Sequence, residues 1–256
     1  MVPRTRLGLA KSMNSTHEWL QERYTGLWNG AIDEVREGRV TIDPLLASRE
    51  PDRRRCITLL ARPAADLQRS VTEFLNELRA LDPEQYYYDP SELHVTVLSL
   101  FTATLDHERY LARYAEYLAA VKAALVGRSA WTLAFTGVTL TREAIMIQGF
   151  PNSTALNELR EVLRKELRTR GLTEGLDSRY ILQTAHMTVV RFRTPLRDSA
   201  AYAGVVEQYR DRSFGRMEVR ELNLVENDWY LSRASVKLLE RFQLSSNSAP
   251  QGSQPA

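Results

Sequence analysis

Two short stretches of the chain read alike: "LHVTVLSLF" at Leu93–Phe101 and "AHMTVVRF" at Ala185–Phe192. Each contains a histidine, an apolar residue, a threonine and a second apolar residue, although the whole chain of 256 residues has only four histidines. Both stretches are apolar and rich in β-branched residues, which predicts strands. The repeated phrase indicates that His94 and His186 occupy equivalent places in a duplicated fold.

Strand geometry gives the polar residues of each stretch a common direction. Successive side chains of a strand point to opposite faces, so His94 and Thr96 share one face while the valines beside them point to the other. His186 and Thr188 share a face in the same way. If two lobes are related by a pseudo-twofold axis, the two pairs of imidazole and hydroxyl face each other across one cleft.

The order of predicted elements around the two stretches also repeats. Hydrophobic periodicity predicts strand, helix, histidine strand, helix and strand at 55–61, 66–81, 93–101, 106–127 and 131–140. The same order follows at 144–150, 153–170, 185–192, 199–210 and 216–226, and a last strand is predicted within 229–242. A repeat of this length indicates two structural lobes and not a solenoid of short units.

The composition is typical of a globular protein with a buried core, since 43% of the residues are hydrophobic and 26% are charged. The net charge is only +2, so binding of a nucleic acid would depend on a local site. Cys56 is the single cysteine, which excludes an internal disulfide, fits a reducing cytosol and indicates a packing role. No apolar run approaches the ~18 residues of a membrane span, so we expect a cytoplasmic protein.

The two ends of the chain differ from its middle. Residues 1–14 and the tail 243–256, which is rich in Ser, Pro, Gly and Gln, have little to bury and are expected to be disordered. Within 15–50, apolar residues recur at three- and four-residue spacing from Trp19 onward, which predicts a helical extension packed on the core. The remaining residues, 51–242, form the two-lobed domain, with lobes at about 51–140 and 141–242.

Two histidines and two threonines around one cleft suit displacement at phosphorus. Histidine has an unperturbed pKa of about 6.5, so one ring can act as a general base while the other is a protonated general acid. Threonine hydroxyls can donate hydrogen bonds to the phosphate oxygens on which negative charge concentrates. The motifs contain neither a cysteine pair nor carboxylates at ligand spacing. We therefore expect no metal and no cofactor.

The sequences "HVTV" and "HMTV" resemble the paired signatures of the two-histidine (2H) phosphoesterase superfamily, which includes RNA 2',3'-cyclic phosphodiesterases once named 2'-5' RNA ligases. Each four-letter motif is weak alone, but the pair within a duplicated order is specific. The resemblance covers about 53–242. It implies an α+β fold with two lobes, in which two antiparallel sheets face a central cleft, the helices lie outside and both motifs line the cleft.

The resemblance also implies roles for individual residues. His94 and His186 match the catalytic pair, and Thr96 and Thr188 match hydroxyls that hold the phosphate. Arg191 matches a basic residue often found after the second motif, where it would bind substrate. Its odd spacing from His186 predicts, however, that it points away from the catalytic face unless the strand twists or ends there.

Aromatic residues near the motifs are the remaining candidates. Tyr88, in "YYYDP" at 86–90, lies closest to the first histidine strand and is assigned to substrate binding through stacking on a base, with a rigid packed loop as the alternative. Trp229 and Tyr230 are expected to pack the last strand. His17 and His107 lack a threonine partner and are expected on the surface.

Together these features predict a metal-independent phosphodiesterase that hydrolyses a ribose 2',3'-cyclic phosphate or a related RNA or nucleotide phosphodiester. The alternatives are a phosphodiesterase for 2'-5' oligonucleotides or for cyclic nucleotides or dinucleotides, and a non-catalytic protein that binds RNA ends or nucleotides. We expect RNA ends or nucleotide cyclic phosphates as partners, a monomer without an obligate protein partner, and no membrane. The expected pH profile is bell-shaped near neutrality and insensitive to chelator, and the near symmetry leaves open which histidine is the base.

Overall fold

The structure is a computed structural model that describes residues 6–246, with side chains from residue 16 onward. Its helices are α1 (Arg6–Asn29), α2 (Ile32–Arg36), α3 (Pro44–Ser48), α4 (Ala65–Leu81), α5 (Glu108–Leu111), α6 (Tyr114–Leu125), α7 (Ala155–Thr169) and α8 (Ser199–Gln208). Its strands are β1 (Cys56–Ala61), β2 (Tyr86–Tyr87), β3 (Val95–Ser99), β4 (Trp131–Leu140), β5 (Ala144–Pro151), β6 (Met187–Arg191), β7 (Ser213–Val219), β8 (Glu221–Asn227) and β9 (Lys237–Gln243). Every element predicted between residues 55 and 210 has a counterpart here.

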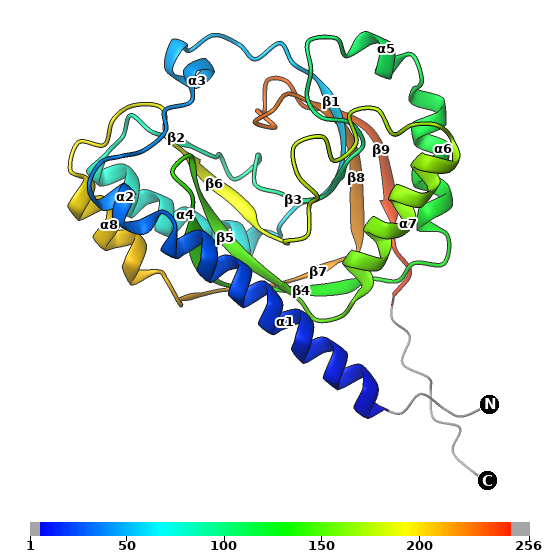
Figure 1. Ribbon diagram of the computed structural model, residues 1–256, viewed down its shortest axis with the longest axis horizontal. Coiled ribbons are helices and arrows are strands. Elements are labelled where there is room, and N and C mark those ends of the chain that lie inside the picture. The colour runs from blue at the N-terminus through cyan, green and yellow to red at the C-terminus, as the bar shows by residue number, and fades with distance from the viewer. Residues whose placement is uncertain (1–5, 247–256) are drawn as a thin grey trace.

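The strands form two antiparallel sheets. One has the order β3-β1-β8-β9 and the other the order β2-β6-β5-β4-β7. The two motif strands, β3 and β6, therefore belong to different sheets, and both lie near the centre of the molecule (Figure 1). This arrangement confirms the predicted α+β class and places one histidine motif on each sheet.

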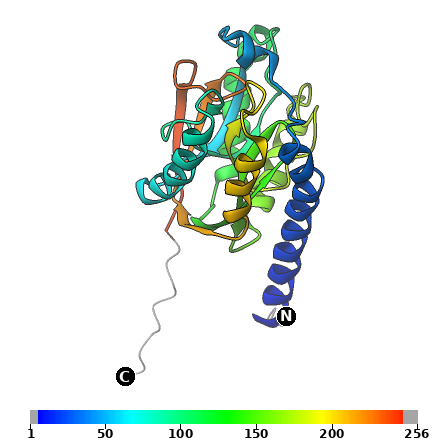
Figure 2. The same ribbon diagram turned by 90° about the vertical axis from the view of Figure 1, so that its left-hand side faces the viewer.

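Helices pack against both sheets. Helices α6 and α7 pack against each other beside the four-stranded sheet, and α4 and α8 pack together along the five-stranded sheet (Figures 1 and 2). In α7 the leucines that face the core recur at three- and four-residue spacing, namely Leu156, Leu159, Leu163 and Leu167. Side chains from both sheets join one continuous hydrophobic core.

The boundary expected between two lobes at residue 140 does not coincide with the sheets. Strand β4 pairs with β5 in the five-stranded sheet, although the repeat placed β4 in the first lobe. Strands β8 and β9 return to the four-stranded sheet beside β1. The chain thus exchanges strands between its halves, and each sheet is built from both.

One predicted strand, at 216–226, is two strands in different sheets. Strand β7 ends at Val219 and β8 begins at Glu221, so Arg220 is the crossing point. The physical reason is visible in the burial pattern, which alternates along β7 and becomes nearly continuous along β8. One face of β7 is exposed to solvent, whereas both faces of β8 are covered by protein.

Other boundaries also differ from the prediction. The helix expected at 106–127 is broken into α5 and α6, and the last strand begins only at Lys237. Helix α1 begins at Arg6, so residues 6–14 are helical and were wrongly expected to be disordered. At the other end, Ser245 still pairs with Ser129 in an isolated bridge. The disorder expected at 1–5 and 247–256 concerns residues outside the described part of the chain.

Helix α1 is fastened to the five-stranded sheet by a buried tyrosine. The Tyr24 hydroxyl donates to the carbonyl of Gly149 (3.2 Å) and accepts from the amides of Gly149 (3.3 Å) and Ala185 (3.2 Å). Gly149 also lets the segment before His186 lie close to β5, because a Cβ there would lie 2.0 Å from the Ala185 carbonyl oxygen. Helix α1 therefore contacts the chain one residue before His186.

Candidate active site

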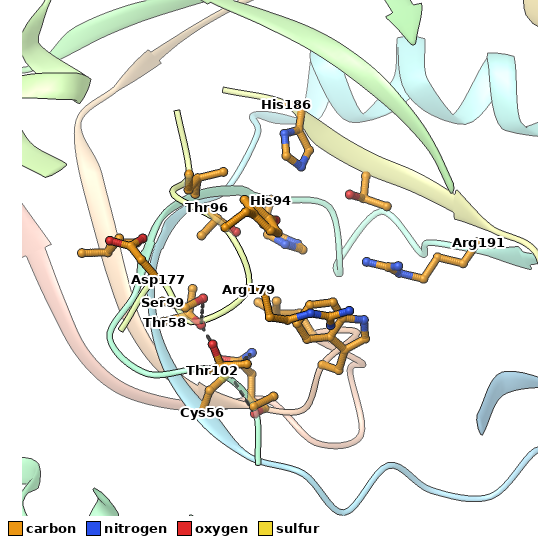
Figure 3. A pocket seen from close by; sticks show the side chains of 18 of the residues that line it. Cys56, Thr58, His94, Thr96, Ser99, Thr102, Asp177, Arg179, His186 and Arg191 are labelled. Carbon is orange, nitrogen blue, oxygen red and sulfur yellow. Dashed lines mark hydrogen bonds between the residues drawn. The ribbon is translucent and has the colours of Figure 1, made fainter. Parts of the chain in front are cut away.

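The four motif residues line one pocket. His94 and Thr96 enter it from the start of β3, and His186 enters it from the start of β6 (Figure 3). Thr188, on β6, also lines it. The enclosed volume is about 140 Å³. The valines that alternate with the first pair, Val95 and Val97, are buried on the opposite side, as the strand period requires.

Both motif strands contain a β-bulge at the same place. In the pairing of β1 with β3, Leu59 faces Leu98 and Leu60 faces Thr96, so Val97 is the extra residue. The pairing of β5 with β6 likewise passes from Val190 to Thr188 and leaves out Val189. The duplication therefore extends to an irregular backbone feature. Bulges re-aim the side chains that follow them.

The bulge corrects the direction predicted for Arg191. Without it, Arg191 would alternate away from His186, whereas the extra residue Val189 returns it to the side of Thr188 and into the pocket (Figure 3). Ser99, two residues beyond the bulge at Val97, also lines the pocket. The sequence contains no direct signal of this extra residue, because Val189 is a regular strand former.

The tautomer of His94 is fixed by a backbone carbonyl. Its Nδ1 lies 2.7 Å from the carbonyl oxygen of Glu92, which can only accept, so Nδ1 carries the proton. In the neutral ring the Nε2 atom then has a free lone pair. The pKa of His94 is lowered to about 3, mainly by burial and in addition by the charges of Arg62, His186 and Arg191, against the opposing effect of the hydrogen bond with the Glu92 carbonyl.

The Nδ1 atom of His186 contacts a threonine hydroxyl, where that of His94 contacts a backbone carbonyl. Nδ1 of His186 lies 2.8 Å from Oγ1 of Thr184, which can donate or accept, so either tautomer is compatible with the contact. Burial lowers the pKa of His186 to about 4, and the positive charges of Arg160 and Arg191 act in the same direction. Both rings are therefore neutral at pH 7 in the free protein. The sequence-based expectation of one protonated ring near neutrality does not hold without substrate.

Tyr88 supports Arg191 and does not offer a free aromatic face. Its side chain is only 1% exposed, and its hydroxyl accepts a hydrogen bond from Nε of Arg191 at 3.1 Å. The ring also lies 6.2 Å from the ring of His94. Stacking of Tyr88 on a base, as the sequence suggested, is therefore excluded by its burial, although Tyr88 does line the pocket.

Two pocket residues, Trp229 and Arg179, were missed by the sequence reasoning. Trp229 lines the pocket, and its ring lies 4.2 Å from the guanidinium of Arg179 and 5.7 Å from that of Arg191. The sequence had assigned Trp229 to packing of the last strand. It instead directly follows Asp228, just beyond the end of β8, where a strand end meets the pocket. The position of a tryptophan at the end of a strand was the one sequence feature that could have indicated a pocket residue.

The opposite wall of the pocket combines uncharged side chains with Asp177, whose carboxylate pairs with Arg164 (Figure 3). Thr58 and Ser99 contact each other there, with 3.2 Å between their hydroxyl oxygens, and Cys56 lies beside Thr58. Burial raises the pKa of the Cys56 thiol to about 12, so it is protonated and inert as a nucleophile. Positive charge in the pocket is thus concentrated on the side of Arg191 and Arg179.

The other histidines lie elsewhere. His17 is exposed on α1, and its ring stacks on Phe150, whereas His107 is half-buried at the start of α5. Among the residues that the structure describes, no cluster of three or more His, Cys, Asp or Glu side chains has a metal-binding arrangement. No described helix is long and apolar enough to cross a membrane.

Comparison with solved structures supports the fold. TT0787 of Thermus thermophilus aligns with a TM-score of 0.58 and 15% identity over 75% of this chain and 100% of its own. A structure described as a phosphoesterase gives a TM-score of 0.51 and 16% identity over 77% of this chain and 99% of its own. E. coli LigT complexed with ATP gives 0.50 and 15%, also over 77% and 99%. No curated protein has a significantly similar sequence.

Each of the two sheets contributes one His-x-Thr motif to the pocket. This fold and arrangement are those of the two-histidine phosphoesterases. The family model of the 2'-5' RNA ligase superfamily matches residues 67–229, which include both motifs. The chain therefore belongs to the 2'-5' RNA ligase superfamily.

Proposed function

We propose that the protein is a metal-independent phosphodiesterase that hydrolyses a ribose 2',3'-cyclic phosphate at an RNA end or on a nucleotide. The observation that carries this proposal is the pocket itself, in which two imidazoles and two hydroxyls from equivalent bulged strands surround one space. The family is one of phosphoesterases, and E. coli LigT was solved with ATP, which makes nucleotides the natural first probes.

The reaction needs one proton removed and one delivered. A base takes a proton from water, whose oxygen attacks phosphorus, and the P–O bond to the ribose breaks as an acid protonates the leaving oxygen. A cyclic phosphate thereby becomes a phosphate monoester and a free hydroxyl. His94 suits the base, because its Nδ1 proton is held by Glu92 and its Nε2 lone pair is free. His186 is then the acid.

The substrate itself supplies the charge that the acid requires. An anionic phosphate near an imidazole favours the protonated ring and so raises its pKa from the low value of the free protein. Thr96 and Thr188 would donate hydrogen bonds to the non-bridging oxygens, and Arg191 would neutralise the charge that grows on them. His186 is thus protonated only when a phosphate is present.

The test is a substrate panel followed by exchange of each histidine. Purified protein is incubated with nucleoside 2',3'-cyclic phosphates, 2'-5' and 3'-5' dinucleotides and cyclic dinucleotides, and products are identified by mass spectrometry and phosphorus NMR. We expect turnover of a 2',3'-cyclic phosphate, and its loss in both His94→Ala and His186→Ala. His17→Ala, an exposed histidine outside the pocket, is the matched control and should retain activity.

The alternatives correspond to other outcomes of the same panel. Turnover confined to a 2'-5' dinucleotide or a cyclic dinucleotide would replace the cyclic phosphate as substrate but keep the two-histidine chemistry. Binding of nucleotides without any turnover would indicate a non-catalytic binding protein. Undiminished turnover of a good substrate by both alanine variants would reject the proposed mechanism.

A further inference from the structure

Arg160 is a buried cation that bonds to the first histidine motif and to the peptide just before the second. It lies on α7 with 1% of its surface exposed. Its Nη2 donates to the carbonyl oxygens of Thr96 (3.0 Å) and Thr184 (2.8 Å), and its Nε donates to that of Val97 (2.8 Å). One guanidinium therefore joins the strand that carries His94 to the segment that leads into His186.

The contact with Val97 explains how the first bulge is tolerated. Val97 is the residue left out of the pairing between β1 and β3. A buried carbonyl outside the ladder requires another donor, and Arg160 provides it. The entry of Ser99 into the pocket depends on this bulge.

Tyr24 binds the same segment on the opposite side of the peptide group. The carbonyl of Thr184 and the amide of Ala185 belong to one peptide group. Arg160 donates to that carbonyl, and the hydroxyl of Tyr24 accepts from that amide at 3.2 Å. The side chain of Thr184 in turn contacts Nδ1 of His186. This peptide group is thus held at both ends immediately before the second histidine.

The cost of burying Arg160 argues for a specific role. A buried charge is normally paired, yet Arg160 forms no salt bridge with any described carboxylate, and its partners are the three carbonyls and the side-chain oxygen of Asn157. Burial lowers its pKa to about 10, so it remains charged at neutral pH. The α4 helix, which occupies the equivalent place in the repeat, has an apolar stripe without such an arginine.

Arg164, one turn further along α7, is a matched comparison. It is also buried, at 5% exposure, but it pairs with Asp177 (2.7 Å) and donates to the carbonyl of Leu182 (3.2 Å). It forms no hydrogen bond with either motif strand. The two arginines have similar burial but different partners.

We infer that Arg160 and Tyr24 are positioning residues that clamp the Thr184–Ala185 peptide and hold the two histidine motifs in register across the pocket. The consequence for catalysis rests on the proposed function, whereas the consequence for the geometry and titration of His186 does not. The inference also gives α1 a role, because Tyr24 brings this helix into the support of the site.

The test combines turnover with the titration of His186 followed by NMR of the imidazole. The variants are Arg160→Met, Arg160→Lys and Tyr24→Phe, with Arg164→Lys, which keeps a cation beside Asp177, and Tyr117→Phe as controls, since neither control residue bonds to a motif. A displacement of about 1 Å can cost ~100-fold in rate. We expect Arg160→Met to lower kcat by about that factor with little change in KM, Tyr24→Phe to lower it by about tenfold, and the controls to stay within about twofold.

The titration separates positioning from general loss of stability. Removal of the Arg160 charge should raise the pKa of His186 from about 4 toward its ordinary value, whereas Tyr24→Phe and Arg160→Lys should leave it low while kcat falls. Should Arg160→Met fail to fold, Arg160→Lys and Tyr24→Phe carry the test through kcat. Folded variants of Arg160 and Tyr24 with unchanged kcat and unchanged His186 titration would overturn the inference. A wild-type protein without turnover would reject the proposed function; the imidazole chemical shifts of His186 in Tyr24→Phe and Arg160→Lys, which keep the local charge, would then decide the clamp.

Discussion

Arg191 and Ser99 occupy the same position in the two copies of the motif, two residues beyond an equivalent bulge, and both line the pocket. The two motifs thus share the same bulged backbone but differ in the side chain that follows the bulge. Arg191 makes its side of the pocket cationic, whereas Ser99 is uncharged and contacts Thr58 on the opposite wall. A bound phosphate is expected on the side of Arg191, with the uncharged part of the substrate toward Thr58.

This asymmetry predicts unequal effects of substitution. Arg191→Met should lower kcat/KM by at least ~100-fold, the usual cost of removing one donor to a developing anion, whereas Ser99→Ala should change it by only a few-fold. Steady-state kinetics on the best cyclic phosphate substrate measure both. Equal effects of the two substitutions would contradict a phosphate site on one side of the pocket.

Tyr88 is expected to act through Arg191. Tyr88→Phe removes the acceptor of the Arg191 Nε proton, and an unsatisfied buried donor costs about 1–3 kcal/mol. We expect a lower free energy of unfolding by about that amount and a higher KM. The double variant with Arg191→Met should show strongly non-additive effects on kcat/KM, because both changes disrupt one interaction. Full additivity would show that Tyr88 acts independently of Arg191.

The histidines should make the folded protein sensitive to acid. Their pKa values, about 3 for His94 and about 4 for His186, lie below the ordinary value of 6.5 expected in the unfolded chain. The unfolded state therefore binds more protons below pH 6.5, so this contribution to stability is complete above pH 6.5 and is lost as pH falls toward 4 and then 3. Urea unfolding of wild type and of His186→Asn between pH 7 and pH 4.5 measures it. The variant should lose less stability than wild type over that range.

The same pKa values predict two different pH profiles for catalysis. The profile of kcat/KM reports the free enzyme, in which both rings are neutral above pH 4, so it should fall as pH rises toward neutrality. The profile of kcat reports the complex, in which bound phosphate raises the pKa of the acid, so its maximum should lie nearer neutrality. Chelator should alter neither profile. Coincident profiles would show that the substrate does not raise the pKa of His186.

The elements and the four motif residues could be predicted because each depends on local pattern. Strand alternation placed His94 and Thr96 on one face, and helical spacing located α4 and α7. The bulge at Val189 could not be predicted, since it arises from pairing with β5 and reverses the direction of Arg191. The division of one predicted strand at Arg220 likewise depends on which sheet each part joins.

The position of Arg160 in the sequence contains a signal for a buried polar contact. Arg160 occupies the buried stripe of α7, four residues after Leu156, where an apolar side chain is the rule. A charged residue at such a position indicates a partner inside the protein, although the pattern does not identify it. The partners are carbonyls of two distant segments, which only the tertiary structure brings together.

The most direct measurement of the central claim is hydrolysis of a nucleoside 2',3'-cyclic phosphate in water labelled with oxygen-18, with wild type, His94→Ala and His186→Ala compared by mass spectrometry. If the two histidines activate water and the leaving oxygen, wild type should incorporate one labelled oxygen into each product phosphate, and each single variant should form product only at background rate. Product formation at the wild-type rate by either variant would contradict the account.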